Sequence, residues 1–158
     1  MARRVFFSFH YRNDVWRANQ IRNSWVTQGK EAAGFVDYVD FEKIKKQGDD
    51  AVEKWIDGQL SGTSVTLVLI GEKTDTRPYV QYEVRQSYKK GNGIIGVHIH
   101  NCKDRDAKTC TKGSTNFGEL GKDARGNPVY FFQIAKVYDW ADNYGYKNLG
   151  TWIENAAP

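Results

Sequence analysis

The fold is decided by residues 64–85, whose sequence is SVTLVLIGEKTDTRPYVQYEVR. Residues 64–70 form an apolar run with the length and β-branched composition of a buried strand. Pro78 suits the first turn of a following helix, because proline lacks the N–H that would have no partner there. A strand followed by a helix predicts one unit of a parallel sheet, and an open parallel sheet places ligands at the carboxyl ends of its strands.

The rest of the chain repeats this pattern. We expect further strands at residues 5–9, 35–39, 94–100 and, to close the sheet, within 129–138. We expect helices capped by Asn13 or Asp14, by Asp49 or Asp50, and near Asp142 or Asn143, the last of them packing Leu149, Trp152 and Ile153. Residues 40–48 are predicted to be a charged loop, and residues 101–128 a long irregular excursion. The predicted fold class is α/β, a single domain over residues 1–158 with a central parallel five-stranded sheet and helices on both faces.

Composition limits the classes of function. Hydrophobic residues make up 40% of the 158 residues and charged residues 27%, which is typical of a globular domain. The net charge is +4 with both signs interspersed, and the densest basic cluster is only Lys43, Lys45 and Lys46, so nucleic-acid binding is not expected. The sequence shows no signal peptide and no apolar segment that could cross a membrane, and it has two cysteines. We therefore expect a cytoplasmic protein that does not bind membranes.

The helix of the central unit carries the main candidate for chemistry. Tyr79 and Glu83 are four residues apart, so their side chains are neighbours on one face of that helix. A carboxylate beside an aromatic ring, near the end of a parallel strand, lies where open α/β sheets bind ligands. The alternative is that Glu83 is a solvated surface residue.

Four motifs, in this order along the chain, resemble the conserved boxes of TIR (Toll/interleukin-1 receptor) domains. They are Val5-Phe6-Phe7-Ser8-Phe9, Gly34-Phe35 with Tyr38-Val39-Asp40-Phe41-Glu42-Lys43-Ile44, Ser64 to Ile70, and Tyr79-Val80-Gln81-Tyr82-Glu83. The resemblance covers roughly the first hundred residues and implies the flavodoxin-like TIR fold. Within this family the start of the chain and Val137-Tyr138-Asp139-Trp140 look closest to the TIR-like subunit of the bacterial Thoeris anti-phage system.

The resemblance also implies an activity. Many TIR domains cleave the nicotinamide–ribose bond of NAD, and the Thoeris TIR protein makes a cyclic ADP-ribose-type signal that activates an effector. The catalytic glutamate of the family corresponds to Glu83, and its preceding aromatic residue to Tyr79, where many relatives have Trp. NAD is then a substrate, and no cofactor or metal is expected. The implied partners are other copies of the TIR domain and an effector that is reached through the small-molecule product.

The chemistry fits a single carboxylate. Cleavage at the anomeric carbon of the ribose passes through an oxocarbenium-like state, which an ionised Glu83 could stabilise without a second acid. The residues predicted to bind the substrate are Ser8, Phe9, His10, Tyr11, Asp40, Lys43 and Tyr79. Phe9 and Tyr79 would stack on the nicotinamide, and Arg12, Lys43 or Arg77 would pair with the pyrophosphate. The sequence leaves open whether the product is cyclic ADP-ribose or plain ADP-ribose.

Other functions stay open at this point. One is a non-catalytic interaction module that signals by TIR–TIR docking through residues 40–48. Another is a flavodoxin-like nucleotide enzyme such as a nucleoside deoxyribosyltransferase.

Two histidines and two cysteines could be read as zinc ligands, but their spacing matches no common zinc pattern, so no metal is predicted. These residues are His98, His100, Cys102 and Cys110. No Gly-x-Gly-x-x-Gly follows the first strand, so a Rossmann dinucleotide site is not supported.

Overall fold

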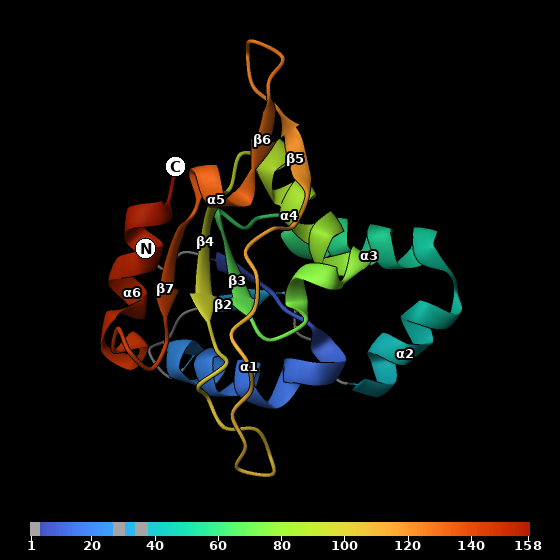
Figure 1. Ribbon diagram of the computed structural model, residues 1–158. Coiled ribbons are helices and arrows are strands. Elements are labelled where there is room, and N and C mark those ends of the chain that lie inside the picture. Colours follow the sequence, from blue (N-terminus) through green and yellow to red (C-terminus); the bar gives the residue numbers. More distant parts are fainter. Residues whose placement is uncertain (1–3, 27–30, 34–37) are drawn as a thin grey trace.

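The computed structural model describes residues 4–26, 31–33 and 38–158 of the chain. Figure 1 shows the order of the elements along the chain. They are β1 (Arg4–Ser8), α1 (Tyr11–Val26), β2 (Glu31–Ala33), α2 (Tyr38–Lys46), α3 (Asp49–Leu60), β3 (Val65–Ile70), the 3-10 turn η1 (Thr74–Thr76), α4 (Pro78–Lys90), β4 (Gly93–His98), β5 (Glu119–Lys122), β6 (Pro128–Tyr130), α5 (Phe131–Ile134), β7 (Lys136–Asp139) and α6 (Gly145–Ala156). None of the helices in these ranges is long and apolar enough to cross a membrane.

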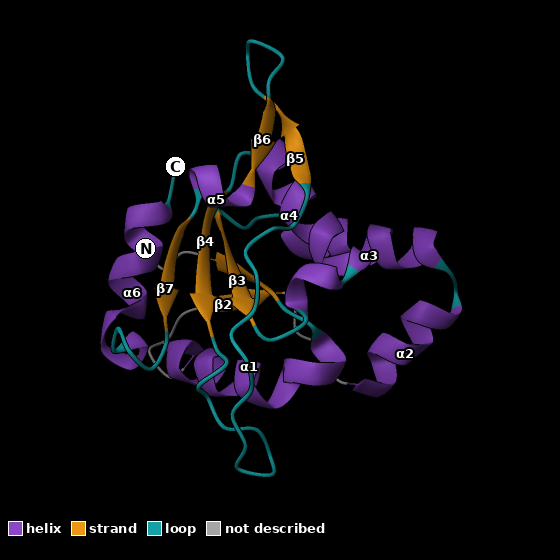
Figure 2. Ribbon diagram, in the orientation of Figure 1, coloured by secondary structure: helices purple, strands orange, loops and turns teal. Residues whose placement is uncertain are grey.

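A five-stranded sheet of order β2-β1-β3-β4-β7 forms the centre of the molecule, and every neighbouring pair in it is parallel. Helices α1 and α6 cover one face, and α3 and α4 cover the other (Figure 2). The predicted α/β class with a parallel five-stranded sheet is therefore confirmed. Parallel sheets of this kind are buried on both faces, which is why β3 is apolar at nearly every position and fully buried.

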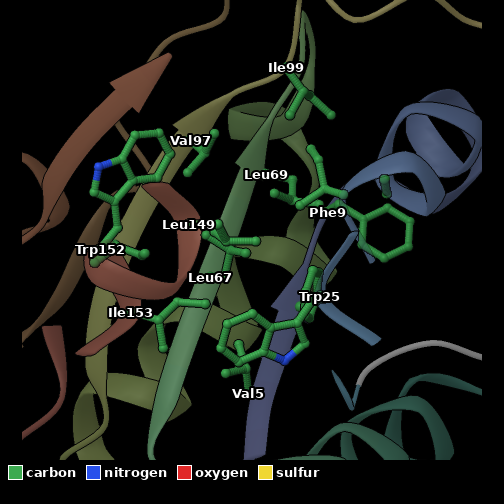
Figure 3. Close-up of a cluster of buried hydrophobic side chains, with 14 of the residues drawn as sticks. Val5, Phe9, Trp25, Leu67, Leu69, Val97, Ile99, Leu149, Trp152 and Ile153 are labelled. Atoms are coloured by element: carbon green, nitrogen blue, oxygen red, sulfur yellow. The ribbon is translucent and has the colours of Figure 1, made fainter. Parts of the chain in front are cut away.

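The largest buried cluster lies between the sheet and helices α1 and α6 (Figure 3). Trp25 of α1 packs there against β1 and β3, and Leu149, Trp152 and Ile153 of α6 are buried as the sequence predicts. The ring of Trp152 stacks on that of Tyr138 in β7, with the ring centroids 4.2 Å apart. Each such large side chain stabilises the fold by about 1.5–3 kcal/mol through burial, so this cluster holds the edge strand β7 firmly to the sheet.

Helix α4 begins and ends where its sequence indicates. Pro78 is its first residue, and Arg77 occupies the N-cap position in an extended conformation. Gly91 ends the helix with a φ of 87°, a left-handed conformation that glycine adopts without steric cost. Val80 and Val84 are buried against β3, so the helix is held in a fixed rotation about its axis. That rotation determines where Glu83 lies.

The prediction for the second strand was wrong. The strand that pairs with β1 is β2 at Glu31–Ala33, whereas the predicted strand covered residues 35–39. Residues 35–37 lie outside the described ranges, and the chain from Tyr38 onward is helical. Helix α2 (Tyr38–Lys46) also replaces most of the charged loop predicted at 40–48. Apolar residues three apart, Tyr38, Phe41 and Ile44, follow a helical spacing that favours this outcome.

The predicted helix caps were also misplaced. Gly48 is the N-cap residue of α3, so Asp49 and Asp50 belong to its first turn, where a carboxylate is favoured by the helix dipole. Helix α1 begins at Tyr11, ahead of the proposed cap residues, and α6 begins after Tyr144. The carboxylate of Asp139 accepts backbone N–H groups of Ala141 and Asp142 instead, forming the turn that precedes α6.

The connection from β4 to β7 contains no long helix. Residues 101–118 have no helix or strand, as predicted, but β5 and β6 then form an antiparallel hairpin that projects away from the main sheet (Figure 1). The hairpin packs on α4 so closely that a Cβ on Gly121 would lie 2.9 Å from the ring of Tyr88. The strand predicted within 129–138 does close the sheet, but it covers only Lys136–Asp139, because β6 and the short helix α5 occupy the residues before it.

A buried ion pair ties the start of this connection to α1. Asp14 and Arg17 are almost fully buried, with Arg17 Nη1 3.2 Å from Asp14 Oδ1. Arg17 also donates hydrogen bonds to the backbone oxygens of Cys102 and Lys108, at 2.8 and 2.9 Å. Because all these groups find partners, the guanidinium is satisfied away from water and the irregular segment is anchored to the helix.

Candidate active site

The carboxyl group of Glu83 lies at the carboxyl end of β1. Side chains alternate along β1, so Val5 and Phe7 face α1 and α6 whereas Ser8 faces α4. The hydroxyl of Ser8 donates a hydrogen bond of 2.8 Å to Oε1 of Glu83. Ser8 is fully buried and Glu83 is 7% exposed, so the glutamate is not a solvated surface residue.

Burial changes the acidity of this glutamate. Loss of water raises the pKa of Glu83 from its ordinary value of 4.5 to about 8, and the Ser8 hydroxyl opposes that rise by bonding the carboxylate. Most of the Glu83 side chains in the ligand-free protein are therefore protonated at pH 7. A positive charge brought next to the carboxyl would favour the ionised form again. The site is thus suited to a cationic ligand.

A cavity of about 210 Å³ opens beside Glu83, between the end of β1 and helices α3 and α4. It is lined by Phe7, Phe9, His10, Tyr11, Arg12, Lys45, Trp55, Ile56, Arg77, Pro78, Tyr79, Val80 and Glu83. Its walls are mostly apolar and aromatic, which suits a planar ring. Drug-sized ligands occupy pockets of about 300–1,000 Å³, so this cavity accommodates a ring with its attached sugar rather than a whole dinucleotide.

Cationic side chains surround the cavity at His10. Burial and the charges of Arg77, Lys73, Arg12 and Lys45 together lower the pKa of His10 to about 4. The imidazole is therefore neutral at pH 7, and its Nδ1 is buried without a hydrogen-bond partner among the described residues. A group of cations that suppresses the protonation of a histidine also attracts anions, and phosphate groups are the anions that arginine and lysine bind best.

Tyr79 forms a fixed wall of the cavity. Its hydroxyl donates a hydrogen bond of 2.8 Å to Asp49 Oδ1 at the start of α3, and this bond is the main reason why the pKa of Tyr79 is raised. Tyr82, one residue before Glu83, is held to Asp57 of the same helix in the same way, at 3.0 Å. Two tyrosine–aspartate hydrogen bonds therefore join α3 to α4 next to the cavity.

The structure brings most of the predicted site residues together. Phe9, His10, Tyr11, Tyr79 and Glu83 all line the cavity, and so do Arg12 and Arg77. Phe9 is also largely a core residue, 6% exposed and stacked on Tyr11 with ring centroids 5.7 Å apart.

Two predicted residues do not line the cavity, and the side chain of a third is not described. Ser8 does not line the cavity, because its side chain is fully buried behind Glu83. Lys43 is exposed on α2, away from the cavity, and Lys45 lines the cavity instead. Asp40 belongs to α2, at a position whose side chain is outside the described part of the chain.

Sequence reasoning missed Trp55 and Lys45. Trp55 lies on α3 outside the buried stripe of Val52, Ile56 and Leu60, whose four-residue spacing is that of a core-facing helix side. An aromatic residue beside such a stripe, on a helix next to a candidate site, is the signal that could have identified it. Lys45 could not be distinguished from Lys43 without knowing that residues 38–46 are helical.

The histidine and cysteine residues at the end of β4 do not assemble a metal site. Within the described ranges no group of three or more His, Cys, Asp or Glu side chains could hold a metal ion, and Cys102 and Cys110 are free thiols. His98 and His100 meet edge to face, with ring centroids 5.7 Å apart, and His100 Nε2 is 3.8 Å from Asp139 Oδ2.

Comparison with known proteins agrees with this geometry. The profile of the family described as "Thoeris protein ThsB, TIR-like domain" matches residues 6–104, which is more than half of the chain and contains all the elements around the cavity. The chain belongs to the TIR-like ThsB family. It is also 35% identical, over 97% of its own length and 100% of the relative, to a Bacillus cereus (strain MSX-D12) protein named "Putative cyclic ADP-D-ribose synthase ThsB1".

Family membership confirms the fold predicted from the four ordered motifs. The match of residues 6–104 ends near the start of the irregular connection, whereas the similarity to the Bacillus relative extends over nearly the whole chain. The sequence similarity to that relative therefore extends past residue 104 as well as over the part of the chain that carries Glu83.

Proposed function

We propose that this protein cleaves the nicotinamide–ribose bond of NAD, with Glu83 as the catalytic carboxylate, and makes a cyclic ADP-ribose-like signal in Thoeris anti-phage defence. The observation that carries the proposal is a buried glutamate beside a cavity with aromatic walls and a cationic rim. The name of the Bacillus relative, a cyclic ADP-D-ribose synthase, supports the same activity.

The substrate itself would activate Glu83. The nicotinamide ring of NAD carries a positive charge, and two opposite charges about 4 Å apart attract each other by about 4 kcal/mol at an effective dielectric constant of about 20. At pH 7, ionising a carboxyl group whose pKa is about 8 costs only about 1.4 kcal/mol, so the attraction exceeds that cost. Binding of NAD would therefore drive the Glu83 proton off at pH 7, and the ionised carboxylate would then stand beside the ribose.

Bond cleavage then needs little further help from the protein. Nicotinamide leaves as a neutral molecule, so no general acid has to protonate it. The positive charge moves to the ribose as the bond breaks, and the Glu83 carboxylate stabilises it in a cavity with mostly apolar walls. Attack on the anomeric carbon by a nitrogen of the adenine of the same molecule closes the ring, whereas attack by water gives ADP-ribose.

The rim of the cavity matches the other half of NAD. The cavity has room for the nicotinamide and its ribose, so the pyrophosphate lies at the mouth. Arg12 and Arg77 are exposed there and can each donate paired hydrogen bonds to phosphate oxygens. Lys45, which also has Glu42 3.6 Å away, adds a third positive charge.

The test compares the wild type with Glu83→Gln, a change that keeps the shape and removes the charge. Purified protein, and extracts of phage-infected cells that carry the gene, are assayed for nicotinamide and for the ribosyl product by mass spectrometry. We expect the wild type to release nicotinamide and a cyclic product, and Glu83→Gln to lose about 10²–10³-fold or more in rate. Glu119→Gln, on the exposed hairpin, is the matched control and should keep full activity. Equal product from the wild type and Glu83→Gln would refute the role of Glu83, and the absence of any product from infected wild-type cells would refute the activity.

A further inference from the structure

Ser8 is the one hydrogen-bond donor that the described residues provide to the Glu83 carboxyl group. The two side chains come from β1 and α4, 75 residues apart in sequence, and their contact is buried. The hydroxyl engages Oε1, and no described residue donates to Oε2. Because Glu83 lines the cavity and Ser8 does not, the serine contacts the glutamate from behind and cannot contact a ligand.

A second serine holds the backbone of the same glutamate. Ser87 Oγ donates a hydrogen bond of 2.7 Å to the Glu83 backbone oxygen, and Thr66 Oγ1 donates one of 2.6 Å to Ser87 Oγ. This chain fixes the helix against β3 but does not touch the carboxyl group. The orientation of the carboxyl group therefore depends on Ser8 alone among the hydroxyl groups of this region that the structure describes.

We propose that Ser8 is a positioning residue, whose hydroxyl anchors one oxygen of the Glu83 carboxyl so that the other is directed to the reacting ribose. The inference rests on the proposed function, because it assigns Ser8 a part in the same reaction. Ser8 also favours the charged carboxylate, since a hydrogen bond to an ionised group in a dry site shifts the equilibrium by roughly tenfold to a hundredfold. Without the Ser8 hydroxyl, the Glu83 carboxyl group would lose its fixed orientation, and its pKa would rise further.

A buried hydroxyl in this place has no packing reason. The neighbouring positions of β1 are apolar, and Ser8 is the polar side chain among the buried residues of that strand. A buried polar group is costly unless it is bonded, and here its bond goes to the candidate catalytic group. Alanine at this position would fill nearly the same volume without that cost.

The experiment compares Ser8→Ala with the matched control Ser87→Ala, since both serines are fully buried and both bond to Glu83. The pKa of Glu83 is measured without ligand by NMR titration of ¹³C-labelled glutamate carboxyl groups, with Glu83→Gln giving the assignment. NAD cleavage is measured as kcat and KM against pH. In Ser8→Ala we expect the pKa of Glu83 to rise by about one unit or more, kcat at pH 7 to fall about tenfold with little change in KM, and the pH profile to move upward. In Ser87→Ala none of these should change beyond about twofold.

Ser8→Cys extends the comparison, because cysteine is close in size but is a weak donor, and an intermediate pKa is expected for it. The inference is overturned if Ser8→Ala and Ser87→Ala give the same pKa for Glu83, or if kcat falls equally in both without a shift of the pH profile. Failure of the proposed function is a separate result. If no form of the protein cleaves NAD, the titration still decides whether Ser8 controls the Glu83 carboxyl.

Discussion

Replacing Glu83 with glutamine should make the protein more stable, and by an amount that grows with pH. The pKa of Glu83 is about 8 in the folded protein and has its ordinary value of 4.5 in the unfolded chain. Between these two values the folded state holds a proton that the unfolded state has released, so the free energy of unfolding of the wild type falls as pH rises. Glutamine resembles the protonated acid and can accept the Ser8 hydrogen bond, but it never ionises.

The size of the effect follows from that shift. Each pKa unit corresponds to about 1.4 kcal/mol, so the wild type should lose about 3 kcal/mol relative to Glu83→Gln between pH 5 and pH 8. With a urea dependence of about 2 kcal/mol per molar, the difference between their unfolding midpoints should widen by about 1–2 M over this range. Other titrating groups, such as His10, are present in both proteins and cancel in the difference.

The assay is urea unfolding followed by tryptophan fluorescence at pH 5, 6, 7 and 8, for the wild type, Glu83→Gln and Glu119→Gln. Glu119 is exposed on the hairpin, so its variant should differ from the wild type by a constant small amount. A constant difference between Glu83→Gln and the wild type across the same range would refute the reasoning, because it would mean that the Glu83 carboxyl is not dehydrated in the folded protein.

Two further predictions use pairs of similar residues in different settings. Lys45 lines the cavity, whereas Lys43, two residues earlier on α2, does not. Lys45→Glu should therefore raise the KM for NAD about tenfold, while Lys43→Glu leaves it within about twofold. A larger loss of signalling in cells from Lys43→Glu than from Lys45→Glu would favour docking through α2 instead. Ala107 has a φ of 59° and Gly126 a φ of 82° in two loops with the same hydrogen bonds, and a Cβ on Gly126 would meet no atom within 4 Å. Ala107→Gly should therefore stabilise the protein and Gly126→Ala should destabilise it, each by about 1 kcal/mol or about 2–4 °C in Tm. Thermal unfolding measures both Tm values, and a change of the same sign in the two variants would contradict the prediction.

The sequence predicts the centre of this fold because the local signals there agree with the tertiary contacts. The apolar run of β3 and the proline that opens α4 determine both elements and place Glu83, and the motif order supplies the rest of the TIR-like assignment. The start of α2 was predicted poorly because Tyr38 and Val39 have strand propensity, while the edge strand that pairs with β1 consists of Glu31, Ala32 and Ala33. A three-residue strand forms through its pairing with β1 and not through its own propensity.

In the candidate site, too, some residues could be predicted from local motifs and others depend on tertiary packing. Glu83, Tyr79 and the residues that follow β1 could be identified because they lie inside recognisable motifs. The role of Ser8 could not, since it depends on which face of β1 meets α4, and that is set by packing between residues 75 positions apart. A serine within an apolar strand was the available signal, and it pointed to a function without showing whether the hydroxyl meets a ligand or another side chain.

The hydrogen bonds that Arg17 donates to the connection after β4 help to order that segment. Two of the Arg17 hydrogen bonds go to the backbone oxygens of Cys102 and Lys108, and backbone oxygens have no proton to gain or lose. Further backbone bonds close the same stretch, from Asp104 to Lys108 and from Cys110 to His100. A segment without helix or strand is thus held by hydrogen bonds to α1 and within itself, so its backbone is ordered without regular secondary structure.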